Sequence, residues 1–335
     1  MKNSKNQDAD LNKNVNRGLV ISSSRNIMTV RVNTEEGFEE LECRIKGKVL
    51  KDQIEVYNPT APGDMVIVER QKNSDSAQAA QRAMILSVEP RKNLFSRFNQ
   101  KGEASQLLAA NIDIVLCVCT PASPPFRPRF IDRVLLQADI AGIGAYVICN
   151  KIDIEYNDID IDERLEEYVR TGYRLLNVSA KTGEGIEELR GIISGKTSVM
   201  TGQSGVGKSS IINALQPGLD LKEGRMNEKY DRGNHTTTMS VMFELTNLSN
   251  PARIIDTPGV RRFIPDGIKS GDVINYMREF SPLAGKCSFG LSCSHRTERG
   301  CKIMEAVHAG VIHEDRYESF LRIIDDLKDK ENDEY

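Results

Sequence analysis

A glycine-rich stretch in the second half of the chain limits its possible folds more than any other feature. It reads Gly202-Gln203-Ser204-Gly205-Val206-Gly207-Lys208-Ser209 and lies between a predicted strand at Val199-Met200 and a predicted helix at Ser210–Leu215. In such a loop, glycines allow backbone N–H groups to point inward around phosphate groups, and the following helix presents its positive end. Lys208 would reach the β- and γ-phosphates and the Ser209 hydroxyl would bind Mg²⁺, with Ser210 beside them. The stretch predicts a nucleoside triphosphate site in an α/β domain.

Two motifs earlier in the chain predict that the base is guanine. Asn150-Lys151-Ile152-Asp153 follows an apolar strand predicted at Ala145–Cys149, and Ser179-Ala180-Lys181 follows a strand predicted at Leu175–Val178. Asp153 can accept both N–H groups on the Watson–Crick edge of guanine, Asn150 can bond the opposite edge, and the stem of Lys151 can pack along the ring. Adenine lacks that pair of donors, so a carboxylate buried against it would be left unpaired, at about 1–3 kcal/mol. An ATPase or kinase that prefers ATP is therefore the weaker interpretation.

A fourth motif, Asp256-Thr257-Pro258-Gly259, ends the strand predicted at Arg253–Ile255. Asp256 would hold Mg²⁺ through water, and the Gly259 N–H would sense the γ-phosphate. A first switch is expected at residues 232–238, between this motif and the phosphate loop. Either Thr236 or Thr237 should complete the Mg²⁺ shell; Thr237 is the ligand we place beside Ser209 and Asp256.

The residue that acts on the attacking water is not where Ras-like enzymes carry it. Val260 follows the Asp-Thr-Pro-Gly motif, at the place of the glutamine that orients water in those enzymes, and an apolar side chain cannot do that. His235 in the first switch is the best substitute, because an imidazole can position or deprotonate water. The alternative is a histidine that only stabilises the switch loop. His235 and Lys208 are thus the candidate catalytic residues.

The order of these motifs is unusual. In an ordinary small GTPase the phosphate loop comes first, whereas here both guanine-reading motifs precede it and Asp256-Thr257-Pro258-Gly259 comes last. The same strands and loops are present, so the sheet can still assemble, and only the chain ends have moved. The chain after Gly259 runs on toward the C-terminal region without returning to the guanine-binding half.

A second chemical cluster lies beyond the GTPase motifs. Cys287, Cys293, His295 and Cys301 form the pattern Cys-x5-Cys-x-His-x5-Cys. Three thiolates and an imidazole suit tetrahedral Zn²⁺ in a closed structural site, and four protein ligands leave no open position for catalysis. The alternative is a set of reduced cysteines in a small helical core.

The periodicity of apolar residues divides the rest of the chain. Residues 17–90 carry short alternating strands separated by turn residues, which predicts a closed barrel of about five strands of the oligonucleotide-binding (OB) type. The strands are expected at Gly18–Ile21, Met28–Val32, Met65–Val68 and Ala83–Leu86, with a long loop at Gln71–Gln81. Residues 105–265 alternate strands and helices, including helices at Pro128–Ala141 and Ile186–Ile193, as in a doubly wound α/β GTPase domain. The remaining segments are a disordered tail at 1–16, a linker at 91–104, a mainly helical zinc-binding domain at 266–324 and an acidic tail at 325–335.

The composition of the chain predicts its cellular compartment and the kind of partner that it binds. No apolar run in the 335 residues approaches the length of a membrane span, and the polar N-terminus does not resemble a signal peptide, so we expect a cytoplasmic protein without membrane contact. The net charge of -3 is concentrated in the last eleven residues, which hold six acids and two lysines. The rest of the chain is therefore near neutral, and clusters such as Arg44–Lys48, Arg91-Lys92 and Arg261-Arg262 are either solvated or phosphate-facing.

Together these residues resemble a known family, the ribosome small-subunit-dependent GTPases of bacteria, circularly permuted enzymes known as RsgA or YjeQ. The resemblance rests on the rotated motif order, Gly-x-Ser-Gly-Val-Gly-Lys-Ser, His-Thr-Thr and the Cys-x5-Cys-x-His-x5-Cys cluster, and it spans residues 17 to about 321. It implies an OB barrel, a permuted GTPase and a zinc domain in one monomeric chain. It also implies binding to the small (30S) ribosomal subunit and its 16S rRNA in late maturation, with GTP hydrolysis that the subunit accelerates. The alternative is a nucleotide-regulated, RNA-binding zinc protein with little turnover of its own.

Overall fold

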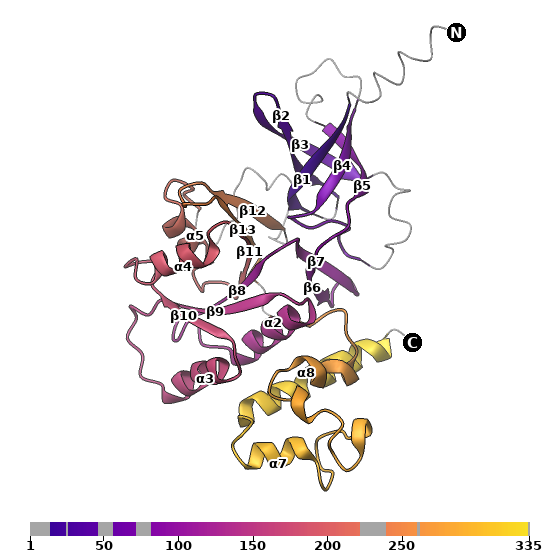
Figure 1. The fold of residues 1–335 in the computed structure, drawn as a ribbon, viewed down its shortest axis with the longest axis vertical. Coiled ribbons are helices and arrows are strands. Elements are labelled where there is room, and N and C mark those ends of the chain that lie inside the picture. Colours follow the sequence, from indigo (N-terminus) through magenta and orange to yellow (C-terminus); the bar gives the residue numbers. More distant parts are fainter. Residues whose placement is uncertain are drawn as a thin grey trace, which may run out of the picture. The chain divides into compact units, whose positions relative to one another are not determined.

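The computed structural model describes residues 14–24, 26–45, 56–71, 82–221, 239–259 and 262–333. These residues belong to two compact units, each built from segments that are distant in sequence (Figure 1). The first unit comprises the described parts of Met1–Asp113, Ile193–Val199 and Asp220–Pro258, and the second those of Ile114–Ile192, Met200–Leu219 and Gly259–Tyr335. The domain boundaries expected from the sequence stay predictions, because this division follows packing and not sequence order.

Five strands of the first unit close into a barrel: β1 (Val15–Ser23), β2 (Met28–Thr34), β3 (Gly37–Ile45), β4 (Met65–Arg70) and β5 (Arg82–Val88). They pair in the order β1-β2-β3-β5-β4, and β4 pairs back onto β1, so the sheet has no free edge within this set. The β3–β5 pair is parallel and the others are antiparallel. This confirms the predicted OB-type barrel.

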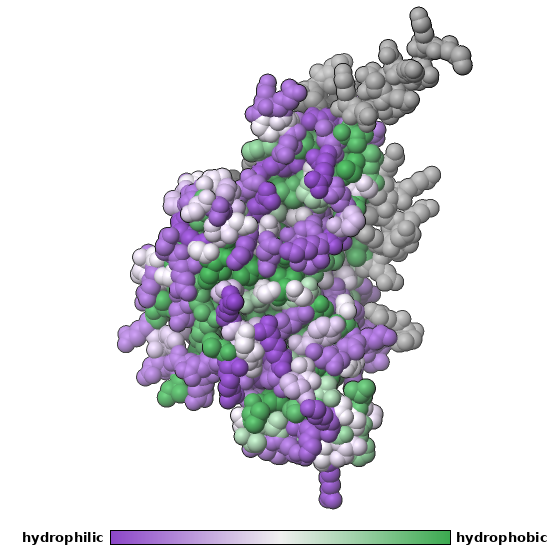
Figure 2. Space-filling view, in the orientation of Figure 1, coloured by the Kyte–Doolittle hydropathy of each residue, from purple (hydrophilic) through white to green (hydrophobic). Residues whose placement is uncertain are grey.

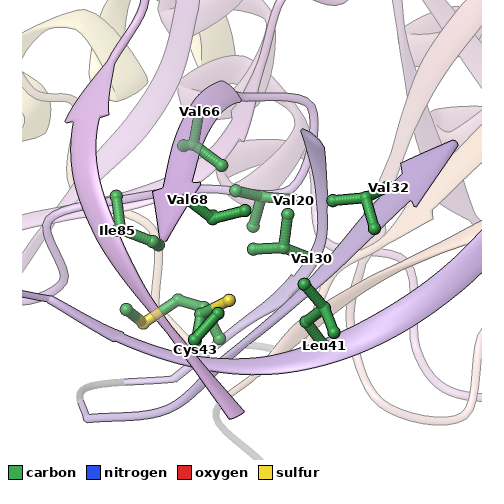
Figure 3. Packing of buried hydrophobic residues seen from close by; sticks show 10 residues of the cluster. Val20, Val30, Val32, Leu41, Cys43, Val66, Val68 and Ile85 are labelled. Atoms are coloured by element: carbon green, nitrogen blue, oxygen red, sulfur yellow. The ribbon is translucent and has the colours of Figure 1, made fainter. Parts of the chain in front are cut away.

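The barrel core is aliphatic. Figure 3 shows side chains from all five strands pointing toward one another, and these residues are almost fully buried: Val20, Val30, Val32, Leu41, Cys43, Val66, Val68 and Ile85. Gly18 leaves room for this packing, since a Cβ there would lie 2.4 Å from a methyl group of Val30. The strand β3 had no clear sequence signal, because Glu39, Glu40 and Glu42 face outward between the buried Leu41 and Cys43.

The expected linker is partly a β-hairpin. Residues 91–104 include β6 (Leu94–Asn99), which pairs in antiparallel fashion with β7 (Ala104–Ala110). Phe95 is completely buried, so this segment packs as structure and does not only connect domains. Two further strands among the described residues of the first unit, β12 (Ser240–Leu245) and β13 (Ala252–Asp256), form an antiparallel pair, and β12 also pairs with β1.

The second unit has the α/β pattern expected of a nucleotide-binding domain. Its strands β8 (Ile114–Cys119), β9 (Gly144–Asn150) and β10 (Arg174–Val178) are parallel in the order β10-β9-β8. Helices α2 (Pro128–Ile140), α3 (Ile159–Arg170) and α4 (Ile186–Ile193) connect or follow these strands, and β11 (Thr197–Gly202) leads through the glycine-rich loop into α5 (Lys208–Leu215). Parallel strands point the same way, so Asn150 and Ser179 emerge at one edge of the sheet. Among these elements of the described residues, the helix α3 had no predicted counterpart.

The C-terminal part of the second unit is mainly helical, as expected. Short turns at η1 (Ser270–Asp272), α6 (Val273–Tyr276), η2 (Ser281–Leu283) and η3 (Gly290–Ser292) precede α7 (Lys302–His308) and α8 (Glu314–Asp333). Phe280 stacks on Phe320 at a centroid distance of 4.5 Å. The hydrophobic face of α8 is fully buried at Phe320, Ile323 and Leu327.

The segment expected as an acidic tail, 325–335, is largely helical, because α8 continues to Asp333. Its acids have basic or polar partners: Asp326 contacts Arg133 and Arg262, and the Glu331 carboxylate accepts hydrogen bonds from the backbone N–H and hydroxyl of Ser270. These contacts hold the acidic end of the chain against the rest of the second unit.

A buried ionic network joins α8 to the α/β part of the same unit, and Figure 1 shows α2 and α8 side by side. The Asp132 carboxylate on α2 accepts hydrogen bonds from Arg316 (2.7 Å), Arg164 (2.9 Å) and Tyr168 (2.8 Å). Arg316 also contacts Glu279 at 2.5 Å. Buried charges need such partners, so the network fixes the helices relative to one another.

The face drawn in Figure 2 is mostly hydrophilic, with hydrophobic residues gathered in separate patches. Among the described residues, none of the helices combines the length and the apolar character needed to cross a membrane.

Candidate nucleotide and metal sites

Asn150 fixes three loops of the second unit to one another. Its side-chain amide donates a hydrogen bond to the Val206 carbonyl in the glycine-rich loop (2.8 Å), and its oxygen accepts one from the Ala180 N–H (3.1 Å). The residue is 1% exposed. The three motifs that the sequence separates by up to 56 positions are thus in direct contact. Asn150 serves as a clamp between the guanine-reading loops and the phosphate loop.

Two glycines of the phosphate loop are required for this contact. Gly205 and Gly207 have φ angles of +86° and +92°, in the region that favours glycine. A Cβ on Gly207 would lie 2.3 Å from the amide nitrogen of Asn150. Lys151 adds a second tie, since its ammonium donates to the carbonyls of Gly205 and Ser123, both at 2.8 Å. Ser123 had no sequence signal, because it contributes only a backbone oxygen.

Asp153 is held in place by the neighbouring loop. The Ser179 hydroxyl donates to one of its carboxylate oxygens at 2.7 Å, and the Lys181 ammonium lies 3.5 Å from the other. The hydrogen bond from Ser179 lowers the pKa of Asp153 below its usual value, with smaller contributions from a backbone hydrogen bond and from the charge of Lys181. The carboxylate is therefore ionised at neutral pH, the form that accepts two N–H groups from one base edge. Ile152 connects the same loops through a 3.4 Å hydrogen bond from its N–H to the Val178 carbonyl.

The phosphate-binding end has the expected residues at the start of α5. The Lys208 ammonium lies 3.2 Å from the Gly202 carbonyl and 3.4 Å from that of Gln203, and it is largely buried. Ser209 and Ser210 follow in the first turn of the helix. A Cβ on Gly259 would lie 2.8 Å from the Ser204 backbone nitrogen, so the fourth motif reaches the phosphate loop at Gly259.

Some predicted site residues cannot be placed in this arrangement. Asp256 ends β13 in the first unit and is 8% exposed. His235, Thr236 and Thr237 lie outside the described residues, as does Val260. The roles predicted for them stay predictions.

The predicted zinc ligands come together. The ligand atoms of Cys287, Cys293, His295 and Cys301 all lie within 4.8 Å of one another, and all four residues are buried. The His295 Nδ1 is 3.6 Å from the Cys287 sulfur and 3.5 Å from that of Cys301, and the two sulfurs are 3.9 Å apart. Around a tetrahedral Zn²⁺ with ordinary bond lengths, these separations are about 3.6 Å for sulfur–nitrogen and about 3.8 Å for sulfur–sulfur. The donor set and its spacing fit Zn²⁺.

Burial changes the ionisation of two of these groups. Burial raises the pKa of the Cys293 thiol to about 12. A buried thiolate thus needs a compensating cation, which a divalent metal would supply. Burial also lowers the pKa of His295, so its ring is neutral at pH 7, the form that binds metal.

The loop that carries these ligands is organised by Glu298, which the sequence did not single out. Its carboxylate accepts hydrogen bonds from the backbone N–H groups of Ser294 (2.7 Å), Arg296 (3.0 Å) and Thr297 (3.1 Å). This permits the left-handed backbone of His295, whose φ is +61°. The Tyr317 hydroxyl, from α8, donates to the His295 carbonyl at 2.6 Å. The hydrogen bond from Tyr317 therefore fixes the loop that carries the metal ligands to α8.

Comparison with known proteins agrees with a guanine-nucleotide site. The family model described as RsgA GTPase matches residues 88–264, more than half of the chain. A small ribosomal subunit biogenesis GTPase RsgA from Flavobacterium psychrophilum is 37% identical over 289 residues, covering 85% of this chain and 86% of the relative. The protein of that name from Porphyromonas gingivalis is 37% identical over 290 residues, covering 86% and 90%. The chain belongs to the RsgA GTPase family.

Solved structures agree with this assignment. The crystal structure of YjeQ from Thermotoga maritima is 31% identical, with a TM-score of 0.65 over 93% of this chain and 98% of that one. YloQ, described as a circularly permuted GTPase, is 21% identical with a TM-score of 0.60, which supports the fold alone. Like other members of the RsgA GTPase family, the protein is a GTP phosphohydrolase with permuted motifs, so the ATPase alternative is not supported.

Proposed function

We propose that this GTPase acts in late maturation of the small (30S) ribosomal subunit. It binds the subunit and its 16S rRNA as a monomer, the subunit stimulates GTP hydrolysis, and hydrolysis is coupled to binding or release. The names of the Flavobacterium and Porphyromonas relatives, small ribosomal subunit biogenesis GTPases, support this role at 37% identity over most of both chains. The observation that carries the GTP-dependent part is the Asn150 clamp, which joins the guanine-reading loops to the phosphate loop.

The nucleotide would be held from both ends. Asp153, oriented by Ser179, reads the base edge, and the backbone of Ala180 and Lys181 contacts the guanine oxygen. Lys208 and the N–H groups of residues 202–210 contact the phosphates, where the α5 N-terminus favours negative charge. Ser209, Thr237 and Asp256 are the proposed Mg²⁺ ligands; the ion supplies charge neutralisation between the β- and γ-phosphates.

His235 is the proposed residue that positions or deprotonates the attacking water. This rests on its place in the first switch and on the valine at position 260. If the proposal holds, His235→Ala abolishes the stimulated hydrolysis and leaves GTP affinity nearly intact. Unchanged stimulated turnover would show that the histidine only supports the loop.

We propose that the segment after Gly259 couples the nucleotide state to the C-terminal region. Gly259 packs against Ser204 of the phosphate loop, and Arg262, three residues further on, contacts Asp326 of α8 at 2.6 Å. The chain then continues into the metal-ligand region, which α8 also holds through Tyr317. A shift of Gly259 toward a γ-phosphate would therefore strain contacts within the C-terminal region. Hydrogen exchange of residues 262–301 should differ between the GDP form and a GTP-analogue form; identical protection would exclude the coupling.

The deciding experiment compares hydrolysis of GTP and ATP with and without purified small subunits. We expect GTP turnover that rises several-fold on addition of small subunits, no rise with large subunits, and little ATP turnover. A phosphate-dominated contact also predicts that subunit binding weakens steeply with salt. If the subunit binds in a nucleotide-dependent way but turnover does not rise, the alternative of a nucleotide-regulated RNA-binding zinc protein is correct.

A further inference from the structure

A cavity of about 390 Å³ lies in the second unit, outside the nucleotide and metal sites described above. Its walls come from the N-terminal end of α2, from the segment just after Gly259 and from the start of α8. The residues that define it are Phe126, Arg127, Phe130, Arg133, Arg262 and Phe263. A volume in this range suits one small organic group, and neither the GTP site nor the zinc cluster uses these side chains.

The aromatic part of the cavity is rigid. Phe130 and Phe263 are 6% and 0% exposed and meet edge to face, with ring centroids 6.2 Å apart and an angle of 87°. Phe126 is half-buried, so one aromatic side chain remains partly open to solvent beside this fixed pair. Such an arrangement offers a planar ring a stacking surface at the mouth and an apolar wall inside.

The charged part of the cavity is cationic. Four arginines line it against one carboxylate, that of Asp315. Arg133 and Arg262 share Asp326, each at 2.6 Å, and Arg129 pairs with Glu318 at 2.7 Å.

Two of the arginines, Arg127 and Arg133, have N–H groups without a hydrogen-bond partner among the described residues. The exposed Arg127 guanidinium makes no hydrogen bond or ion pair with any residue in the described ranges. Arg133 is 9% exposed, and its Nε has no partner among those residues. The site thus combines an excess of positive charge with unused donors.

We propose that this cavity binds one unpaired nucleotide of an RNA strand, with its base against Phe126 and its phosphate on Arg127. Unpaired bases in RNA are bound by stacking on aromatic rings and arginine planes, together with contacts to the backbone phosphates, and the cavity supplies both. A purely apolar ligand would leave the guanidinium of Arg127 without an anionic partner. The inference deepens the proposed function and rests on it for the source of the RNA, the small subunit.

The location adds a consequence for hydrolysis. Arg262 and Phe263 follow Gly259 by three and four residues, and Gly259 packs against the phosphate loop. An RNA nucleotide in the cavity would contact this segment directly. Filling the cavity would therefore restrict the segment that senses the γ-phosphate, which connects RNA binding to turnover without any contact between RNA and nucleotide.

The test uses the full-length protein and a fluorescein-labelled hexauridylate as probe, followed by fluorescence anisotropy. The variant combines Phe126→Ala with Arg127→Gln. The control is Arg174→Gln, which removes one exposed charge on β10 in the same unit. The paired variant should bind the probe about tenfold more weakly or worse, with the logarithmic salt slope reduced by about one. The control should bind within twofold of the unaltered protein. All three proteins should keep the same GTP affinity, which reports that the fold is intact.

A second measurement localises the contact and separates the possible failures. A 4-thiouridine in the probe should crosslink to the peptide containing residues 120–133. The inference is overturned if the paired variant binds the probe as the unaltered protein does, if the crosslink maps elsewhere, or if inorganic phosphate competes as well as uridine monophosphate, which would indicate an anion site only. Probe binding through this cavity by a protein that ignores small subunits would support the inference and refute the proposed function. Small-subunit binding that is identical in all three proteins would refute the inference and support the proposed function.

Discussion

Replacing Arg316 by leucine should unfold the junction between α2 and α8. Arg316 is 1% exposed and pairs with Asp132 at 2.7 Å and with Glu279 at 2.5 Å, whose side chains are 0% and 7% exposed. Arg164 would still contact Asp132, but Glu279 would lose the ion-pair partner that Arg316 provides. Removing one partner of a buried ion pair costs about 3–5 kcal/mol, because the remaining charge stays away from water without compensation. The loss should fall at the upper end, since one substitution affects two carboxylates.

A matched control lies on the same two helices. Arg129 of α2 pairs with Glu318 of α8 at 2.7 Å, but both side chains are 46% exposed. Arg129→Leu should therefore cost less than about 1 kcal/mol. Urea unfolding of the zinc-loaded proteins, followed by far-UV circular dichroism, measures both changes in the free energy of unfolding. Equal losses for the two variants would refute the reasoning that burial decides the strength of these contacts.

The same network predicts an acid limit to stability. Burial raises the pKa of Asp132, but the charges of Arg316 and Arg164 outweigh it, and the pKa lies below its usual value. Because the folded-state pKa is below the unfolded value of about 3.9, this stabilisation is complete above about pH 5 and is lost as the pH falls through the folded-state pKa. In Arg316→Leu the pKa of Asp132 rises, so acid unfolding should begin at a higher pH. An unchanged acid midpoint would contradict this.

Three further changes test the sites. Asp153→Asn should weaken GTP binding by at least tenfold and improve binding of xanthosine triphosphate, because the amide donates to the 2-oxo group of xanthine. Titration with fluorescent nucleotides measures both affinities. An unchanged preference for GTP would show that Asp153 does not contact the base. Gly207→Ala should abolish GTP binding, since the added Cβ meets the Asn150 amide at 2.3 Å and the φ of +92° strains any other residue. Wild-type affinity for GTP would mean that the phosphate loop can rearrange to accommodate the methyl group. Cys293→Ser should lower zinc content well below one ion per chain and unfold the ligand loop, as measured by elemental analysis and proteolysis, whereas full zinc occupancy would show that three ligands suffice.

The fold was predictable where local pattern and packing agree. The barrel strands around Val20 and Val68 and the helix α2 show the expected periods of apolar residues, because one face of each is buried. The strand β3 and the helix α3 were missed, since charged residues cover their outer faces and few apolar residues mark the inner ones. The continuation of α8 to Asp333 was also missed, because its acids are compensated by basic residues more than 60 positions away in sequence.

The sequence alone determined the chemistry of this protein. Glycines, Lys208 and Ser209 predict a phosphate loop, Asp153 predicts guanine, and three cysteines with His295 predict a metal cluster, because each of these functions depends on residue type and short spacing. Only the tertiary structure decided how these parts are joined. It placed Asn150 against Val206, and it fixed α8 to α2 through Asp132. It also gathered phenylalanines and arginines from three segments into one cavity. Contacts of this kind depend on which surfaces pack together, and residue type does not encode that locally.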